Sequence, residues 1–292
     1  MEPFSHDHLP GVADLLRRAL LPEDAAEAVD IVEVLRPRYD GFRRTTGWVQ
    51  TDGGQVVGVA FAAVNNADPH VGHLDLVAVD PDRRRRGLGA RLLRQAEDGL
   101  RDFGCTIVRV AGNPPDYAFP GIDVRYTPAI CLVTRAGYAH DRTAWNMTAD
   151  LDPAALDTAA DEARLGAIGV QVRRADADDI ARLRPVIAAE FGGHWAAEIT
   201  TAQAVHLALR DEQPVGFAAW GCTRPSWFGP MGTLPAAKGL GIGSVLLKRC
   251  LLDQSKAGYP RAQIGWVGPV PFYARVVGAR IERVFFLYSK EL

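Results

Sequence analysis

The feature that most constrains this chain is a segment that occurs twice. PDRRRRGLGARLLRQAEDGLRDFG begins at Pro81, and PAAKGLGIGSVLLKRCLLDQSKAG begins at Pro235, which is 154 positions later. The two segments align without a gap, and their first proline, three of their glycines and their leucine pair coincide. A repeat of about 20–50 residues indicates a solenoid, whereas a repeat near 150 has the size of a domain. The sequence therefore predicts two copies of one domain within 292 residues.

Each copy has the same expected order of elements around this segment. Two strands broken by a polar turn (GWVQTDGGQVVGVAFAAV; AVHLALRDEQPVGFAAWG) precede a strand, a glycine turn and a helix that ends at Gly104 or Gly258. Another strand follows, and each copy closes with its own helix and strand. This order predicts an α/β fold (α+β mixed sheet) of two tandem domains, each a mostly antiparallel mixed sheet with helices on both faces. We expect the domains at 1–151 and 169–292, with a linker at 152–168.

Composition narrows the class of protein. A net charge of −2 gives no basic field for nucleic acid, and no apolar run approaches the ~20 residues that cross a bilayer. The first residues carry no secretory signal, and four separated cysteines without a CxxC pair favour reduced thiols over a zinc site. We therefore expect a cytoplasmic protein, monomeric or homodimeric, that needs no metal and binds neither nucleic acid nor a membrane.

The glycine turn is the strongest candidate for a ligand site. Glycines between a strand and a helix let the backbone approach a ligand, and the helix N-terminus attracts anions. A tight turn without a ligand is the alternative. Neither copy contains the Walker pattern GxxxxGK[ST]. Both also fail the dinucleotide pattern GxGxxG, because Leu92 and Leu246 stand at its third position.

In copy one the turn reads Arg84-x-x-Gly87-x-Gly89, which resembles the pyrophosphate-binding signature [QR]-x-x-G-x-[GA] of the GNAT acyltransferase superfamily. Copy two reads Lys238-x-x-Gly241-x-Gly243, with lysine in place of Gln or Arg. The resemblance implies acetyl-CoA or another acyl-CoA as co-substrate, bound by the fourth strand of each copy and by the turn. The residues that it implies are Val77, Ala78, Val79, Arg84, Arg85, Arg86, Gly87, Leu88, Gly89 and Ala90 in copy one, and Met231, Gly232, Thr233, Lys238, Gly239, Leu240, Gly241, Ile242, Gly243 and Ser244 in copy two.

Acyl transfer to an amine needs a base, and the fourth strand of copy one offers two candidates. His73 opens that strand where some GNAT enzymes place a glutamate base, and Asp75 is the second candidate. A surface or capping histidine is the alternative reading of His73. The family's usual acid is a tyrosine four residues before a closing glycine. Copy one has Val133 there, whereas copy two has Tyr273, five residues before Gly278, where a buried core tyrosine is equally expected.

Acceptor-binding residues are expected in two places. The long segment NPPDYAFPGIDVRYTP of copy one is either a pocket wall or a surface flap, and in copy two Trp195 lies in the first helical region. The candidates are Asp116, Tyr117, Asp123, Arg125, Tyr126 and Trp195.

The function expected from these features is acyl-CoA-dependent N-acyl transfer, with acetyl-CoA as donor and a primary amine of a small molecule or protein as acceptor. A non-catalytic acyl-CoA-binding or sensing protein is the alternative, because neither copy holds a full acid–base set. We expect turnover to be carried mainly by the N-terminal copy, which alone has Arg84 in its signature, His73 on its strand and the long loop.

Overall fold

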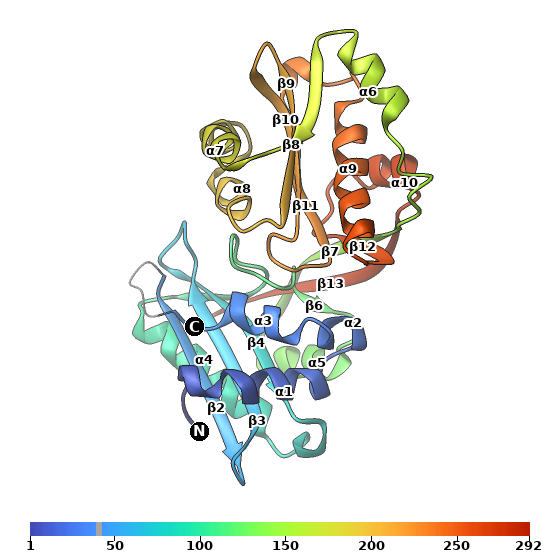
Figure 1. Ribbon diagram of the computed structural model, residues 1–292. Coiled ribbons are helices and arrows are strands. Elements are labelled where there is room, and N and C mark those ends of the chain that lie inside the picture. Colours follow the sequence, from blue (N-terminus) through green and yellow to red (C-terminus); the bar gives the residue numbers. More distant parts are fainter. Residues whose placement is uncertain (39–42) are drawn as a thin grey trace. The chain divides into compact units, whose positions relative to one another are not determined.

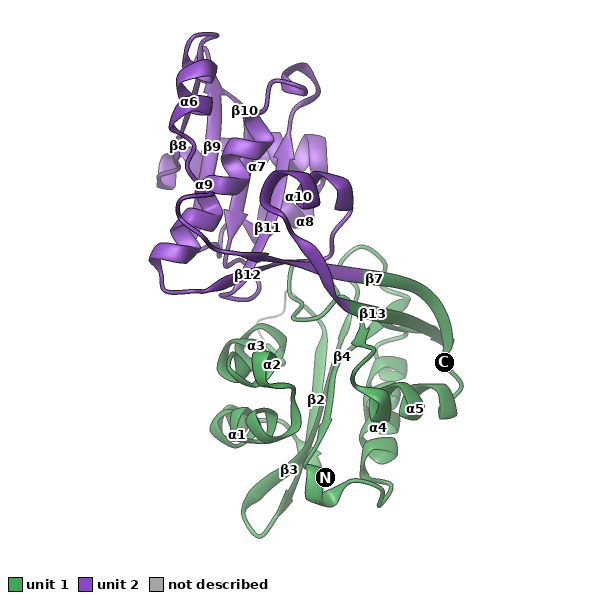
Figure 2. Ribbon diagram, turned by 90° about the vertical axis from the view of Figure 1, so that its right-hand side faces the viewer, with its two compact units in different colours: residues 1–144, 284–292 green, residues 145–283 purple. Residues whose placement is uncertain are grey.

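The computed structural model describes residues 1–38 and 43–292 and divides into two compact units. Unit 1 comprises residues 1–144 and 284–292, and unit 2 comprises residues 145–283 (Figure 2). We expected domains at 1–151 and 169–292 with a linker between them. The units are divided elsewhere because residues 284–292 pack in unit 1, while the expected linker carries helix α6 (Ala159–Gly166) within unit 2.

Unit 1 begins with two short elements and three helices before its sheet. Their bounds are β1 (Glu2–Pro3), η1 (His6–His8), α1 (Leu9–Ala19), α2 (Pro22–Ala25) and α3 (Ala28–Leu35). The bounds of the elements that follow are β2 (Thr45–Asp52), β3 (Gln55–Val64), β4 (Val71–Val79), η2 (Pro81–Arg83), α4 (Leu88–Asp102), β5 (Ile107–Val110), β6 (Ile122–Asp123), α5 (Thr127–Arg135) and β7 (Ala139–Asp150). The strands β1 to β4 pair antiparallel in order, whereas β4 and β5 are parallel.

Helices cover both faces of the unit 1 sheet. Helices α1 and α3 lie on one face, and α4 and α5 lie on the other (Figures 1 and 2). The α4 stripe expected from sequence is buried, with Leu92, Leu93, Ala96 and Leu100 no more than 1% exposed. On the opposite face Leu15, Leu16 and Ile31 pack with Phe61 of β3. The sheet is therefore the middle layer of three.

Unit 2 repeats this plan. Besides α6, its elements are β8 (Val170–Arg174), α7 (Ala177–Phe191), α8 (Gly193–Glu198), β9 (Ala204–Arg210), β10 (Gln213–Trp220), β11 (Trp227–Thr233), η3 (Pro235–Ala237), α9 (Ile242–Lys256), β12 (Arg261–Ile264), α10 (Val270–Val277) and the first residues of β13 (Arg280–Glu291), whose residues from 284 on belong to unit 1. The strands β8 to β11 pair antiparallel in order, and β11 and β12 are parallel. Helices α7 and α8 cover one face, and α6, α9 and α10 cover the other (Figure 1). The expected fold class is confirmed in both units.

We expected each copy to be completed by its own last strand, and the structure pairs the two last strands differently. Residues Met147–Asp150 of β7 pair antiparallel with β12 of unit 2. Residues Tyr288–Glu291 of β13 pair antiparallel with β5 of unit 1. Each sheet is thus completed by the strand that chain order assigns to the other copy. Any strand edge offers the same N–H and C=O ladder, so chain order does not specify the partner.

Candidate functional site

Strand β4 of unit 1 is irregular at Asp75. Leu74 pairs with Ala62 and Leu76 with Phe61, so Asp75 is an extra residue without a partner of its own on β3. Such a bulge bends the strand and redirects the side chain of the extra residue. In unit 2 the corresponding irregularity of β11 falls at Gly229 and Pro230, which lie between the paired residues Phe228 and Met231. Only the bulge of unit 1 therefore carries an ionisable group.

Strands β4 and β5 separate soon after they meet. Their parallel pairing covers Val71, Gly72 and His73, and within the described residues β4 has no pairing with β5 beyond that point. The N–H of Asp80 donates to Val57 O of β3 at 2.9 Å. Because N–H groups alternate between the two edges of a strand, the N–H groups of Val77 and Val79 face the edge that β5 has left. This edge can pair with an extended amide ligand.

The glycine turn of unit 1 has the expected conformation. It follows β4 directly, and Gly87 adopts a left-handed φ of 77° as the N-cap of α4. The first intrahelical bond is donated by Arg91 N to Gly87 O at 3.1 Å. The N–H groups of Leu88, Gly89 and Ala90 precede that bond and have no acceptor within the helix. They are three open donors at the positive end of a helix of 15 residues, where a negative charge is favoured.

Arg84 acts on the turn itself. Its Nε donates to Val79 O and its Nη2 to Ala19 O, both at 3.1 Å. The guanidinium therefore ties the turn to the end of β4 and to α1, and these two nitrogens already have backbone acceptors. Arg85 and Arg86 are exposed, and a surface cavity of about 260 Å³ lies beside Arg86. These two arginines are better placed than Arg84 to meet an anion at the turn.

The turn of unit 2 has the same backbone course. Gly239 and Gly241 have φ of 82° and 85°, and Gly241 caps α9. Ser244 N already donates to Gly241 O at 3.1 Å, so fewer amides stay open than in unit 1. Arg164 of α6 donates to Leu240 O at 2.9 Å and lies over this turn.

A cluster of charged side chains surrounds the bulge of β4. The Asp75 side chain is 3% exposed, and its Oδ2 lies 3.6 Å from Arg43 Nη2. Arg43 Nη1 donates to Asp116 Oδ2 at 3.2 Å. Burial raises the pKa of Asp75 to about 7, because the lowering by the Arg43 charge is outweighed by burial and by the Asp116 charge. A carboxylate that titrates near neutral pH suits a general base.

His73 is fully hydrogen-bonded. Its Nδ1 contacts Ala111 O at 3.0 Å and its Nε2 contacts Asn65 Nδ2 at 3.1 Å. The carbonyl only accepts and the amide nitrogen only donates, so the ring is neutral with its proton on Nδ1. Burial lowers the pKa of His73 to about 4, with the charges of Arg109 and Arg43 in the same direction and the Ala111 bond opposing it. The geometry argues against His73 as the base, because its lone pair is occupied.

The expected acid of unit 2 lies in the hydrophobic core. Tyr273 is 6% exposed, and its ring packs edge-on against Phe228 and Phe272 at centroid distances of 6.2 and 5.1 Å. Burial raises its pKa well above the ordinary value for tyrosine. Val133 of unit 1 is likewise buried, as a core residue of α5. The position in α5 of unit 1 where the resemblance places the acid is therefore taken by a side chain without a hydroxyl.

The long loop of unit 1 contributes to two separate networks. Asp116 joins the cluster around Asp75, and Tyr117 follows it, half-buried. Farther along, Arg125 donates to both carboxylate oxygens of Asp123 at 3.0 and 2.8 Å and pairs with Glu23 of α2. Tyr126 Oη donates to Asp24 Oδ2 at 2.7 Å. Asp123, Arg125 and Tyr126 thus attach the loop to α2 and are not brought together with Asp75.

Trp195 of unit 2 stacks on Phe191 with ring centroids 5.6 Å apart and also packs against Phe217. It therefore fills the α7–α8 face of its own unit.

Sequence reasoning missed Arg43, which precedes β2 in the segment FRR and follows no recognisable spacing. It also missed Asn65, whose Oδ1 accepts from the N–H groups of Ala67 and Asp68, so that its amide donates to His73. Only the folded chain brings these residues to β4.

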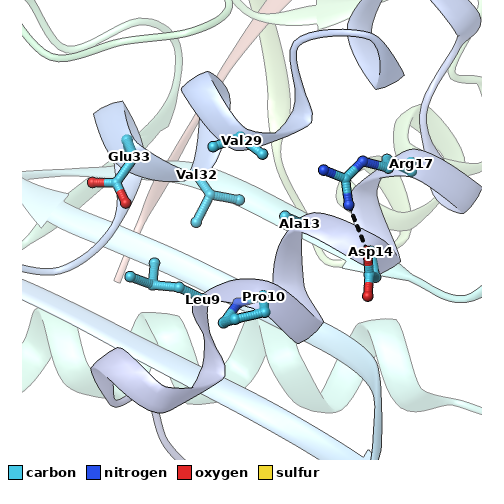
Figure 3. A pocket seen from close by; sticks show the side chains of 8 residues that line it. All are labelled: Leu9, Pro10, Ala13, Asp14, Arg17, Val29, Val32 and Glu33. Carbon is cyan, nitrogen blue, oxygen red and sulfur yellow. Dashed lines mark hydrogen bonds and ion pairs between the residues drawn. The ribbon is translucent and has the colours of Figure 1, made fainter.

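Unit 1 has another surface cavity away from this cluster. It measures about 310 Å³ and lies between α1 and α3, with Leu9, Ala13 and Val32 on its walls and Asp14 paired to Arg17 beside them (Figure 3). In the described ranges no group of three or more His, Cys, Asp or Glu side chains could hold a metal ion. Among the described helices none is both long and apolar enough to span a bilayer.

Three comparisons with known proteins bear on this site. The model of the acetyltransferase (GNAT) family matches residues 11–119. A curated protein of Escherichia coli strain K12, "Uncharacterized N-acetyltransferase YhbS", is 36% identical over 119 residues, which cover 39% of this chain and 68% of that protein. The family match covers the turn and the bulge of unit 1.

Solved structures resemble the whole chain at low identity. A tandem GNAT protein from the clavulanic acid biosynthesis pathway has a TM-score of 0.73 at 17% identity, covering 99% of this chain and 97% of that one. A GCN5-related glucosamine N-acetyltransferase region of a fungal multi-domain GH3 β-N-acetylglucosaminidase has a TM-score of 0.75 at 17% identity. It covers 99% of this chain, which spans 38% of that longer protein. These likenesses establish the fold of both units.

Proposed function

Because the chain belongs to the GNAT acetyltransferase family and carries two tandem GNAT-like folds, we propose that unit 1 transfers an acetyl group from acetyl-CoA to a primary amine. The family supports acyltransferase activity in general. The donor, the acceptor class and the residues that act are the proposal. It rests chiefly on Asp75, a buried carboxylate at the bulge of β4 with a pKa of about 7.

Two backbone features support acetyl-CoA as the donor. The N–H groups of Val77 and Val79 on the open edge of β4 suit the amides of the pantetheine arm. The open amides of Leu88 to Ala90 suit the pyrophosphate. A thioester held along β4 would then end near the bulge, where the charged cluster lies. Unit 2 offers a similar turn but has Gly229 and Pro230 in place of an ionisable bulge residue.

Asp75 would supply the proton transfer. In its ionised form it takes a proton from the attacking ammonium, so that the amine lone pair attacks the thioester carbonyl. The nitrogen adds to the thioester carbonyl, and the backbone N–H groups of β4 stabilise the tetrahedral oxyanion that results. The attached nitrogen then gives up its second proton to water, and the C–S bond breaks as the oxyanion collapses to the amide. The leaving thiolate takes a proton from water, since its pKa is near the ~8.5 of an ordinary thiol. No protein acid is required.

Thiol release from acetyl-CoA with a panel of primary amines tests this function. Activity is expected with at least one amine, and kcat/KM should rise with pH through about 7 as Asp75 ionises. Asp75→Asn should lower kcat about 10²–10⁴-fold, the usual loss when a general base is removed, while calorimetry finds acetyl-CoA affinity unchanged.

Tyr273→Phe is the control, because this residue lies in the core of unit 2 and should leave kcat near wild type. Acetyl-CoA binding without thiol release from any amine would favour a non-catalytic acyl-CoA-binding protein instead. An inactive Tyr273→Phe variant beside an active Asp75→Asn variant would move the active site to unit 2.

A further inference from the structure

We propose that Arg43 is a positioning residue for acetyl transfer. It joins Asp75 of β4 to Asp116 of the loop after β5 and so holds the base at the point where β4 and β5 separate. This inference rests on the proposed function of Asp75. It assigns a role to two residues that lie outside the glycine signature and outside β4.

The contacts bring together three distant parts of unit 1. Arg43 Nη2 lies 3.6 Å from Asp75 Oδ2, and Arg43 Nη1 donates to Asp116 Oδ2 at 3.2 Å. Arg38 adds a weaker contact of 3.8 Å to the second Asp116 oxygen. One guanidinium therefore bridges two carboxylates, one from each side of the point where β4 and β5 part.

Burial of the Arg43 guanidinium costs free energy of folding. The Arg43 side chain is 11% exposed, and its Nε and Nη2 are buried without a hydrogen-bond partner. An unsatisfied buried donor costs about 1–3 kcal/mol. Such a cost is tolerated where function uses the group, and here the guanidinium directs one of its unsatisfied nitrogens toward the proposed base.

The position of Arg43 is itself constrained. Thr45 begins β2 two residues later, and its hydroxyl contacts both the backbone N–H and the backbone carbonyl of Arg38, each at 3.1 Å. This clamp fixes the start of β2 against the segment that precedes it. Arg44 points elsewhere and donates to Phe103 O at 2.8 Å.

Electrostatics give the bridge a measurable consequence. The charged groups that act on Asp75 are the guanidinium of Arg43 and the carboxylate of Asp116, which shift its pKa down and up respectively, against a background of burial. His73 lies two residues away on β4 and is neutral, because its Nε2 accepts a hydrogen bond from the Asn65 amide and so carries no proton. Removing Arg43 should therefore raise the pKa of Asp75, and removing Asp116 should lower it.

The first experiment titrates Asp75 directly, without substrate. Protein labelled at the aspartate side-chain carboxyl carbon is followed by NMR against pH, and the Asp75→Asn spectrum assigns the signal. The wild-type midpoint is expected near 7. Arg43→Gln should move it upward and Asp116→Asn downward, each by about one pH unit or more, as expected for charges within a few ångströms.

The second experiment measures kcat/KM against pH for the same proteins. The acid limb should move in the same directions as the NMR midpoints, and Arg43→Gln should lower kcat at pH 7 ~10-fold with little change in the KM for acetyl-CoA. Arg43→Lys keeps the positive charge but lacks the planar guanidinium that contacts two carboxylates. The titration midpoint of Asp75 in this variant should therefore be closer to the wild-type value than its kcat is. Arg44→Gln removes a neighbouring charge and should match wild type in both readouts.

The outcomes separate this inference from the function on which it rests. If the wild type transfers acetyl groups and neither variant moves the Asp75 midpoint or the acid limb, the positioning role is wrong and the function stands. If the wild type binds acetyl-CoA but acetylates no amine, the function fails and the inference fails with it. Shifts in the expected directions in both experiments support both.

Discussion

Residues of one type take different roles within a few positions of each other. Arg84 bonds to two backbone carbonyls and stabilises the turn, whereas Arg85 beside it adopts a left-handed φ of 64° and is exposed. The aligned position in unit 2 is Gly239, with φ of 82°. This backbone conformation is unfavourable for residues that have a Cβ. Unit 1 nevertheless has an arginine here, where glycine would adopt the conformation more easily. An exposed arginine beside open helix amides is the arrangement expected of an anion site.

The buried neutral state of His73 predicts a stability effect that depends on pH. Its pKa of about 4 lies below the ~6.5 of an unfolded histidine, so between these values the unfolded chain binds the extra proton and stability falls as pH falls. From pH 7 to pH 5 His73 should contribute a loss of about 2 kcal/mol in the free energy of unfolding.

Denaturant unfolding of wild type and His73→Gln at these two pH values measures the effect. Glutamine can keep a donor and an acceptor but does not titrate. The free energy of unfolding of His73→Gln should therefore fall less between pH 7 and pH 5 than that of the wild type, and the difference should equal the contribution of His73. Equal losses in the two proteins would contradict a buried neutral histidine.

Among the elements, the strand–turn–helix unit recurs in both halves with the same left-handed glycines. Gly87 and Gly241 cap the two helices, and Gly104 and Gly258 follow their ends with φ of 85° and 93°. These positions need backbone conformations that glycine adopts without strain, which explains why they align. The two units differ instead in the strand before the turn, where only unit 1 places a carboxylate at the bulge.

The turn of unit 1 predicts a selective effect of side-chain size and charge at Gly89. An added Cβ would lie 3.4 Å from Leu132 Cδ2, which is ordinary contact, so Gly89→Ala should bind acetyl-CoA nearly as wild type does. Gly89→Glu places a bulky negative group against the open amides of α4 and should weaken binding at least ~10-fold by steric exclusion and charge repulsion.

Isothermal titration calorimetry with acetyl-CoA compares the two variants. Unchanged affinity and stoichiometry for Gly89→Glu would place the acetyl-CoA site away from this turn.

At the scale of the whole molecule, the last residues of the sequence, 284–292, pack in the unit that the first residues form. Tyr288 of β13 is 4% exposed and packs in the same cluster as Leu93 and Leu100 of α4. Lys290 Nζ contacts Glu97 Oε1 of α4 at 2.8 Å, and the same oxygen accepts from Tyr138 Oη at 2.9 Å. Unit 1 is therefore incomplete until residues 284–292 are present.

This allocation predicts that a substitution near the end of the chain destabilises the first unit. Tyr288→Ala should lower the free energy of unfolding of unit 1 by about 3 kcal/mol, as for other buried aromatic side chains. Hydrogen exchange followed by mass spectrometry should find faster exchange in β4 and α4, with β11 and α9 unchanged.

Ile281→Ala is the matched control, because this residue of β13 is 44% exposed and lies in unit 2. Faster exchange in unit 2 after Tyr288→Ala would mean that β13 completes that unit instead.

The sequence by itself determined the local structure of this protein and its duplication. Apolar spacing predicted α4, the glycines predicted the turns, and the shift of 154 residues identified two copies, because each of these signals is carried by neighbouring residues. The tertiary structure alone decided which of His73 and Asp75 keeps an available lone pair, since that depends on Ala111, Asn65 and Arg43 arriving from elsewhere. It also decided which closing strand completes which sheet. Strand edges offer the same hydrogen bonds to any partner, so this choice is made by the packing of whole units and is not encoded in a local pattern.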